Sequence, residues 1–191
     1  MKISLFFICL LFAFTCSAQA GGATQVFPTS AGPVKITPLF HASTLIEAGG
    51  KVIYLDPAKP ANFAGQPKAD LVLITDIHGD HMDPASLTAI SKPGTEILAA
   101  PAVVTYGGVR FYFSGDTEGV PEMRALKNID VAFVCMNLPY TMPPEEAADA
   151  VKAFHPKVVI PYHYRGSDPA IFQKKLEGTG IEVRLIDWYP K

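Results

Sequence analysis

Four side chains that could bind a metal ion lie within six positions of the sequence. Asp76, His78, Asp80 and His81 follow the apolar run DLVLIT, which has the composition of a buried strand. Imidazole nitrogens and carboxylate oxygens are the ligands that hydrolytic divalent metals use. Because a loop that leaves a strand can point several side chains into one concave site, we interpret this segment as a metal-binding loop. The alternative is a polar turn that happens to contain two of the chain's five histidines.

This loop resembles the H-x-H-x-D-H signature of the metallo-β-lactamase superfamily, with Asp76 in place of the first histidine. FSGDT (113–117) resembles the superfamily's G-D-T motif, whose aspartate bridges two metals. IPYHY (160–164) resembles the strand end that carries the last histidine ligand. FHAS (40–43), a hairpin and LDP (55–57) together resemble the ascorbate-phosphate lactonase-like branch. The resemblance extends in the family's order from about Val34 to the C-terminus.

The resemblance implies an α/β fold, namely a four-layer αββα sandwich of mixed sheets with the site along one edge between the sheets. It also implies ligands for two metal ions, with Asp116 shared between them. The remaining ligands are Asp80, His81 and His163 for one ion, and Asp76 and His78 for the other. The nucleophile would be a metal-bound hydroxide, because such metals lower the pKa of bound water from about 16 toward about 7.

Three residues outside this ligand set, His41, Asp56 and His155, could also contribute to the site. Asp80 and His41 are the candidates for a direct catalytic role, although a structural role for His41 is equally open. Asp56 could hydrogen-bond a metal ligand. His155 follows an expected helix, where a capping role is the ordinary explanation. Cys135 lies in an apolar run without an activating partner, so we expect a buried structural thiol.

Two departures from the family pattern affect the expected metal content. Asp76 replaces a nitrogen donor by a charged oxygen donor. In addition, only 34 residues separate His81 from Asp116 and none is a histidine, so the middle region is short and lacks one family ligand. We therefore expect one tightly bound Zn²⁺ and a weaker, oxygen-rich site that Mn²⁺ could occupy.

These residues favour a metal-dependent hydrolase acting on an ester, lactone, amide or phosphoester. One alternative is a catalytically weak or inactive metal-binding or scaffold protein of the same fold. Another is a defective chain that folds poorly because of the short middle region. We expect a small-molecule substrate and no nucleic-acid partner, because the near-neutral charge provides no basic stripe. The oligomeric state stays open.

The elements expected to position these side chains are short β-branched runs followed by alternating strands and helices. The hairpin STLIEAGGKVIYL turns at Gly49-Gly50, which can supply the positive φ values that the turn needs. The expected helices cover 84–91, 143–155 and 169–176. The expected strands cover 34–40, 43–47, 51–55, 70–75, 96–99, 109–113, 131–135, 158–161 and 181–186.

The first twenty residues have the pattern of a signal peptide. Lys2 precedes an apolar core at 3–15, and Ala18-Gln19-Ala20 fits a cleavage site. An uncleaved anchor is the alternative, although the core is short for a membrane span; a lipoprotein site at Cys16 has less support. We expect an exported protein, periplasmic or secreted, without stable membrane insertion after cleavage. Residues 21–33 are expected to be a flexible lead-in and 34–191 a single domain. Because cleavage would remove Lys2, the net charge of −2 would become −3.

Overall fold

The computed structural model describes residues 22–99 and 102–189, which form two mixed β-sheets that pack face to face. The first sheet has the strand order β1-β2-β3-β4-β5-β6 and the second has the order β11-β10-β9-β8-β7. The strands of the first sheet are β1 (Gln25–Phe27), β2 (Val34–Phe40), β3 (Ser43–Ala48), β4 (Lys51–Leu55), β5 (Leu71–Ile74) and β6 (Glu96–Ala99). Those of the second are β7 (Ala102–Tyr106), β8 (Val109–Phe113), β9 (Val131–Cys135), β10 (Val158–Tyr162) and β11 (Glu182–Val183).

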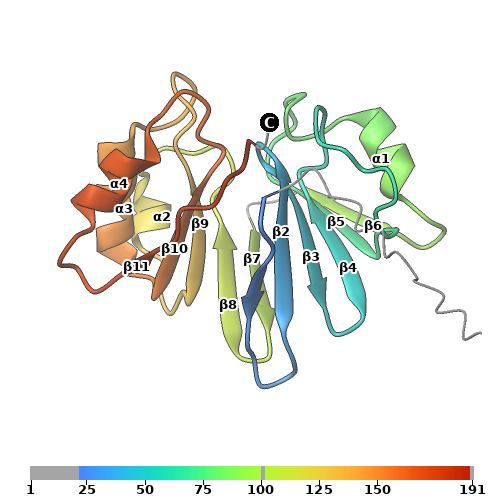
Figure 1. Ribbon diagram of the computed structural model, residues 1–191, viewed down its shortest axis with the longest axis horizontal. Helices are drawn as coiled ribbons and strands as arrows, with labels where there is room; N and C mark the ends of the chain where they lie inside the picture. Colours follow the sequence, from blue (N-terminus) through green and yellow to red (C-terminus); the bar gives the residue numbers. More distant parts are fainter. Residues whose placement is uncertain (1–21, 100–101, 190–191) are drawn as a thin grey trace, which may run out of the picture.

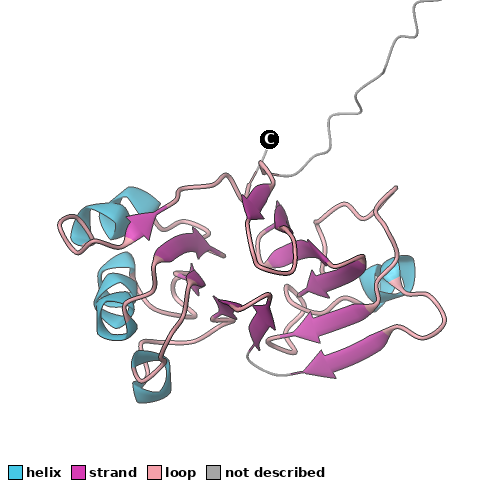
Figure 2. Ribbon diagram, turned by 90° about the horizontal axis from the view of Figure 1, so that it is seen from below, coloured by secondary structure: helices cyan, strands magenta, loops and turns pink. Residues whose placement is uncertain are grey.

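Helices cover the outer face of each sheet, which gives the four layers expected for an αββα sandwich (Figures 1 and 2). The helix α1 (Pro84–Ile90) lies outside the first sheet. The helices α2 (Pro121–Arg124), α3 (Pro144–Phe154) and α4 (Pro169–Lys175) lie outside the second. The predicted fold class is therefore confirmed.

Apolar side chains hold these layers together in two clusters. The larger cluster fills the space between the sheets and beneath α3, where the Phe113 and Phe133 rings stack with centroids 4.6 Å apart. Burial of such side chains is the main favourable contribution to folding. The smaller cluster includes Tyr54, Val72 and Ile90, and it joins the first sheet to α1. Both clusters leave the loops at one edge of the sheets free to carry polar side chains.

Parallel pairing brings the carboxyl ends of the central strands to that edge. β4, β5 and β6 are parallel in the first sheet, as are β8, β9, β10 and β11 in the second. The hairpin between β3 and β4 turns at Gly49 and Gly50, whose φ values are +56° and +74°, as the sequence predicted. The loops that follow the parallel strands therefore meet between the two sheets.

Three short elements were not anticipated. β1 lies within the expected lead-in and pairs with β2, which ties residues 25–27 to the sheet. β7 forms an antiparallel hairpin with β8 within the short middle region, and α2 begins at Pro121. β11 covers only two residues of the expected strand 181–186. β1, α2 and β11 have two to four residues, which are too few to show a period in the sequence.

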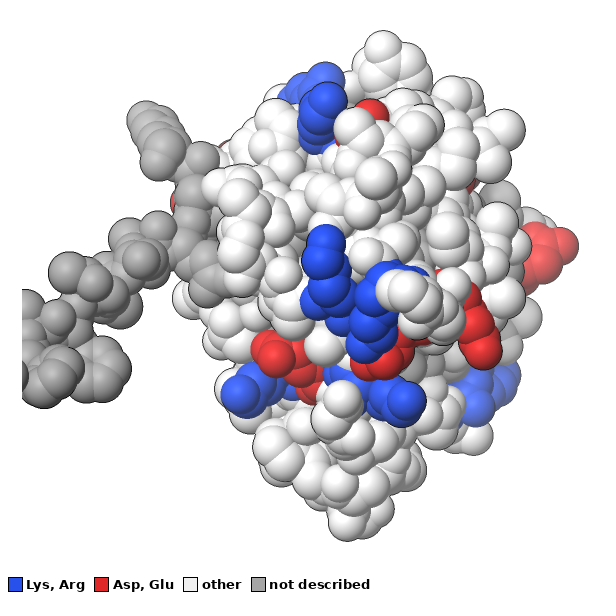
Figure 3. All heavy atoms as spheres, turned by 90° about the vertical axis from the view of Figure 1, so that its right-hand side faces the viewer, with Lys and Arg blue, Asp and Glu red and all other residues white. Residues whose placement is uncertain are grey.

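The short middle region leaves β6 at the border of the first sheet, where its only strand partner among the described residues is β5. Its four residues are all exposed, including Ile97 and Leu98. On the adjoining face, basic and acidic side chains lie side by side and are surrounded by uncharged residues (Figure 3). In one ion pair of this part of the fold, the Lys92 ammonium lies 2.8 Å from the Asp70 carboxylate. No helix within residues 22–99 and 102–189 is long and apolar enough to cross a bilayer.

Candidate metal centre

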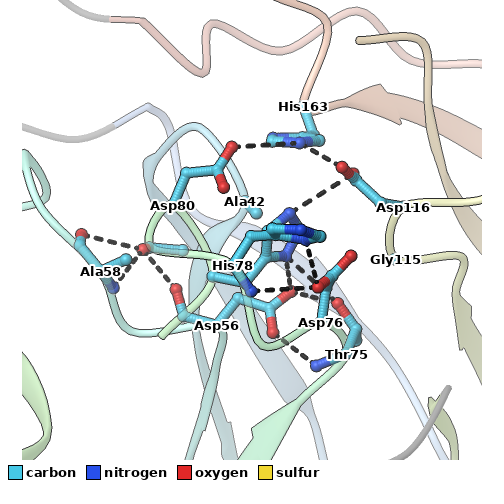
Figure 4. Close-up of polar contacts among 12 residues, drawn as sticks. Ala42, Asp56, Ala58, Thr75, Asp76, His78, Asp80, Gly115, Asp116 and His163 are labelled. Carbon is cyan, nitrogen blue, oxygen red and sulfur yellow. Dashed lines mark hydrogen bonds and ion pairs between the residues drawn. The ribbon is translucent and has the colours of Figure 1, made fainter. Parts of the chain in front are cut away.

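Every predicted ligand, and the catalytic candidate His41, lies just after the carboxyl end of a strand, at the edge where the two sheets meet. His41 follows β2, and the loop with Asp76, His78, Asp80 and His81 follows β5. From the second sheet, Asp116 comes after β8 and His163 directly follows β10. Figure 4 shows His163 between the carboxylates of Asp80 and Asp116. Ligands far apart in the sequence therefore converge because the strands that precede them are neighbours.

The loop after β5 divides its four polar side chains into two pairs. The backbone N–H groups of His81 and Met82 both donate to the His78 carbonyl oxygen at 3.0 Å, which closes a tight turn. The imidazole of His81 is fully buried, whereas that of His78 is 78% exposed. His78 Nδ1 lies 2.7 Å from Asp76 Oδ1. Asp76 and His78 are outside both groups of converging donor atoms among the described residues.

Asp56 fixes the orientation of His81 from behind. The fully buried Asp56 carboxylate accepts hydrogen bonds from the Thr75 backbone N–H at 2.7 Å and from the Thr75 hydroxyl at 2.5 Å. Its Oδ2 also lies 3.0 Å from His81 Nδ1. A hydrogen bond from Nδ1–H to this carboxylate leaves Nε2 as the free lone pair of the ring. The sequence-based prediction for Asp56 therefore has a geometric basis.

His81, Asp116 and His163 form the first group of converging donor atoms. His81 Nε2 lies 3.4 Å from Asp116 Oδ1, which in turn lies 2.9 Å from His163 Nε2. Two ligand atoms on one tetrahedral zinc ion, each about 2.0 to 2.1 Å from it, are roughly 3.3 Å apart. The spacing of this group is therefore that of a metal coordination shell.

Three buried atoms of these residues have no hydrogen-bond partner among the described residues, and one of them is His163 Nδ1. The other two, His81 Nε2 and Asp116 Oδ1, face each other at 3.4 Å without forming a hydrogen bond of acceptable geometry. Leaving a buried polar atom unsatisfied costs about 1 to 3 kcal/mol. A divalent cation between them would satisfy both, so these residues fit a metal ion.

His41, Asp80 and His163 form the second group, which shares His163 with the first. His41 Nε2 lies 3.1 Å from Asp80 Oδ2, and the His41 and His163 ring centroids are 3.7 Å apart. Asp80 Oδ2 is 3.9 Å from His163 Nε2. The structure thus separates Asp80 from the predicted set with His81 and Asp116, because the Asp80 carboxylate pairs with His41.

The charges in the two groups shift the pKa values of their members in opposite directions. Burial, together with the neighbouring His163, lowers the pKa of His41 to about 4, so His41 is neutral at pH 7. Burial would also lower the pKa of His81, but the carboxylates of Asp116 and Asp56 on its two nitrogens raise it to about 10. Burial opposes ionisation of Asp116, yet His163 and His81 hold the pKa of that carboxyl well below its usual range. The first group therefore favours a positive charge between its donors.

Glycine and tyrosine hold Asp116 in place from the second sheet. Gly115 has a φ of +60°, and its backbone N–H donates to the Tyr162 hydroxyl oxygen at 2.8 Å. An added Cβ at Gly115 would lie 2.7 Å from Thr75 Cβ. The G-D-T loop can therefore approach the metal loop only with glycine at this position.

Two partners of the centre were not identified from the sequence. Asn137 follows β9, and its Nδ2 lies 3.1 Å from His163 Nε2. The Tyr189 hydroxyl lies 2.8 Å from His41 Nδ1. A polar residue after a buried strand could have indicated Asn137, whereas no local pattern marks Tyr189. By contrast, His155 caps α3 with its ring near the Thr179 carbonyl, and Cys135 is buried with its thiol pKa raised by burial.

Comparison with known proteins places this arrangement in a family. Residues 35–110 and 91–164 each match a beta-lactamase superfamily domain. A UPF0173 metal-dependent hydrolase of Thermococcus onnurineus is 30% identical over 217 aligned positions, which cover 80% of this chain and 96% of that protein. Since 217 positions exceed the 191 residues of this chain, that relative contains segments without a counterpart here. A Deinococcus radiodurans relative of the same description is 40% identical over 92 residues, covering 44% of this chain and 40% of that protein.

Solved structures agree with the sequence matches. A protein from Parabacteroides distasonis, described as a metal-dependent hydrolase, superimposes with a TM-score of 0.81 at 31% identity over 86% of this chain and 98% of that chain. The metallo hydrolase Igni18 of Ignicoccus hospitalis gives a TM-score of 0.67 at 25% identity over 80% of this chain and 94% of that chain. The matching domains, the shared sandwich and the ligands in the family's order show that this chain belongs to the metallo-β-lactamase superfamily.

Proposed function

We propose that this protein is a metal-dependent hydrolase whose principal ion binds His81, Asp116 and His163. The observation that carries the proposal is the pair of unsatisfied buried atoms, His81 Nε2 and Asp116 Oδ1, which face each other beside His163 Nε2. When bound, a divalent ion supplies a Lewis acid and lowers the pKa of water from 15.7 toward about 7. The names of the relatives, which describe metal-dependent hydrolases, support the same class of reaction.

The residues around the ion have separate tasks in this proposal. Asp56 orients His81, and Gly115 brings Asp116 toward the first sheet. Asp80 has more access to solvent than Asp116, because its side chain is 36% exposed and that of Asp116 is 15% exposed. The side chains of His81 and His163 are fully buried. The Asp80 carboxylate is ionised, since His41 and the nearby histidines lower its pKa against the effect of burial. An ionised, accessible carboxylate can accept a proton from water or from a substrate hydroxyl.

We further propose zinc as the principal ion, because two nitrogens and one carboxylate oxygen leave a fourth position open for water, as in catalytic zinc sites. A second ion would be held less tightly and exchange more readily, and Mn²⁺ could occupy that position. The substrate is proposed to be a small molecule with an ester, lactone, amide or phosphoester bond. The near-neutral charge of the chain, which provides no basic stripe, supports a small substrate over a nucleic acid.

Turnover of generic ester and phosphodiester substrates, measured before and after metal removal, tests this function. Activity should be lost with chelation and return with Zn²⁺ or Mn²⁺. His163→Ala should lower metal affinity by several kcal/mol of binding free energy, on the order expected for losing one ligand of a tight site. The matched variant His155→Ala should bind metal like the parent. Metal binding without turnover on any substrate would favour the scaffold alternative, and equal affinities for both variants would contradict the ligand assignment.

A further inference from the structure

The position of a second ion is a separate question, since His41 and Asp80 form a donor group that the family motif does not contain. The motif would place the second ion at Asp76 and His78. In this structure the donor atoms of those two residues approach each other and no third described ligand joins them. The His78 side chain is 78% exposed and extends into solvent. With the family's additional histidine missing, this position retains one nitrogen donor.

On the other side of His163, a nitrogen donor is already in place. His41 is 3% exposed, and its Nε2 lies 3.1 Å from Asp80 Oδ2. The donor atoms of His41, Asp80 and His163 all lie within 4.8 Å of one another, as do those of His81, Asp116 and His163. The imidazole of His41 packs against that of His163 at a centroid distance of 3.7 Å, so both rings border the same space.

His41 is also oriented as metal-binding histidines commonly are. Its Nδ1 lies 2.8 Å from the Tyr189 hydroxyl, which leaves Nε2 directed toward Asp80. A partner on the distal nitrogen fixes the ring orientation of a ligating histidine. The Tyr189 hydroxyl can also accept a hydrogen bond from Nδ1–H when Nε2 binds an ion. The segment is further anchored by the His41 backbone N–H, which donates to the Trp188 carbonyl at 3.3 Å. His78 has no comparable anchor among the described residues beyond Asp76.

We propose that the second, weaker ion binds at His41 and Asp80, beside His163, instead of at Asp76 and His78. The nitrogen donor lost with the short middle region is thereby replaced by a histidine from the end of β2. The position offers a nitrogen and a carboxylate oxygen with water completing the shell, which suits Zn²⁺ or Mn²⁺ and predicts weaker binding than at the principal group. This inference rests on the proposed metal-dependent function, because it assumes that the principal ion is bound.

Titration of the metal-depleted full chain with Zn²⁺, followed by calorimetry and by equilibrium dialysis, distinguishes the two positions. The parent should bind one ion tightly and a second more weakly. His41→Ala should weaken the second ion at least about 10-fold and leave the first within a few-fold of the parent. His78→Ala, the matched control from the motif position, should leave both affinities unchanged.

Two conservative variants keep the test decisive if His41→Ala does not fold. His41→Gln retains a side chain of similar size that can still bond to Tyr189 but removes the imidazole, and it should lose the second ion. Tyr189→Phe should weaken the second ion by a smaller factor through loss of the anchor. Circular dichroism of each variant reports on folding independently of metal.

Several results would overturn the proposal. One is loss of the second ion in His78→Ala with parent-like binding in His41→Gln. Another is a parent that binds a single ion whose affinity does not change in the His41 variants. Absence of turnover with two bound ions would count against the hydrolase function and leave the position of the second ion standing. Turnover by a parent protein that never binds a second ion would overturn this inference and leave the hydrolase function standing.

Discussion

At the residue scale, the principal site depends on a carboxylate that does not itself face the ion. Asp56 is fully buried, and it keeps His81 in a single tautomer by accepting from Nδ1. It also holds Thr75 at the start of the metal loop through two hydrogen bonds. One side chain therefore sets both the direction of a ligand and the path of the backbone that carries it.

Asp56→Asn tests this role with almost no change in size. Because the Thr75 backbone N–H needs an acceptor, the Asn oxygen would take the position of Asp56 Oδ1 and its nitrogen that of Oδ2, beside His81. An amide nitrogen cannot accept a hydrogen bond, so His81 Nδ1 would become the acceptor and Nε2 would carry the proton. We expect metal affinity to fall by roughly 10- to 100-fold. The control is Asp130→Asn, because the Asp130 carboxylate also accepts a backbone N–H, from Arg110 at 2.8 Å, yet belongs to neither donor group. Equal Zn²⁺ affinities for the two variants in calorimetry would refute the role of Asp56.

At the scale of elements, the centre is built from the loops after β5, β8 and β10, and each of these loops requires a particular backbone shape. The metal loop ends at Asp83, whose carboxylate accepts the Ser86 N–H at 2.8 Å and caps α1. The loop after β8 turns at Gly115 with a positive φ, and His163 itself has a φ of +47°. Left-handed conformations of non-glycine residues cost about 1 to 3 kcal/mol and concentrate at functional sites.

Gly115→Ala should disturb both stability and metal binding. The alanine would have to keep the positive φ of Gly115, and its methyl group would lie 2.7 Å from Thr75 Cβ. Relief of this clash should push Asp116 away from His81. We expect the free energy of unfolding to fall by about 1 to 3 kcal/mol, with weaker Zn²⁺ binding.

Gly178→Ala is the matched control for this substitution. Gly178 also has a positive φ, of +75°, but an added Cβ there meets no atom within 4 Å. Only the conformational cost of roughly 1 kcal/mol should remain, and metal affinity should not change. Denaturant titrations with and without Zn²⁺ separate the two effects. A Gly115 variant that binds Zn²⁺ as tightly as the Gly178 variant would contradict the predicted shift of Asp116.

At the scale of the whole molecule, the donor groups join the two sheets. His81 and Asp80 come from the first sheet, whereas Asp116 and His163 come from the second. An ion bound between these side chains would therefore connect the two sheets.

Metal removal should accordingly lower the melting temperature of the protein. A ligand that binds only the folded state stabilises it by about 2.7 kcal/mol at a concentration 100 times its Kd. Differential scanning calorimetry of the parent with a chelator and with saturating Zn²⁺ measures the shift. The shift should nearly vanish in His163→Ala and persist in His155→Ala. A parent whose melting temperature does not depend on Zn²⁺ would contradict binding between the sheets.

Export is also a property of the whole chain and stays a prediction, since residues 1–20 lie outside the described residues. The positive start, the apolar core and Ala18-Gln19-Ala20 predict a mature protein that begins at Gly21. Intact-mass measurement or N-terminal sequencing of the exported protein checks this. Recovery of the chain from the membrane fraction with Lys2 still attached would rule it out.

The sequence by itself determined the fold class and the strand ends that carry the ligands. Apolar runs such as DLVLIT and VAFVC mark strands buried on both faces, and the polar residues that follow them must lie at the edge of a parallel sheet. The resemblance of the ordered motifs to the metallo-β-lactamase superfamily then predicted the sandwich. β1, β7 and α2 could not be predicted in this way, because their short segments are held by pairing and packing and not by local pattern.

Tertiary structure decided which of the predicted ligands converge. Asp76 with His78, and Asp80 with His81, each pair an aspartate with a histidine in the same loop. The sequence alone therefore could not show which pair points into the site. The turn closed on the His78 carbonyl directs His81 into the core and His78 toward solvent. Likewise, sequence left the role of His41 open, since its partners Asp80, His163 and Tyr189 are between 39 and 148 positions away. A side chain's direction follows from the turn and the neighbouring strands that surround it, which only the folded chain contains.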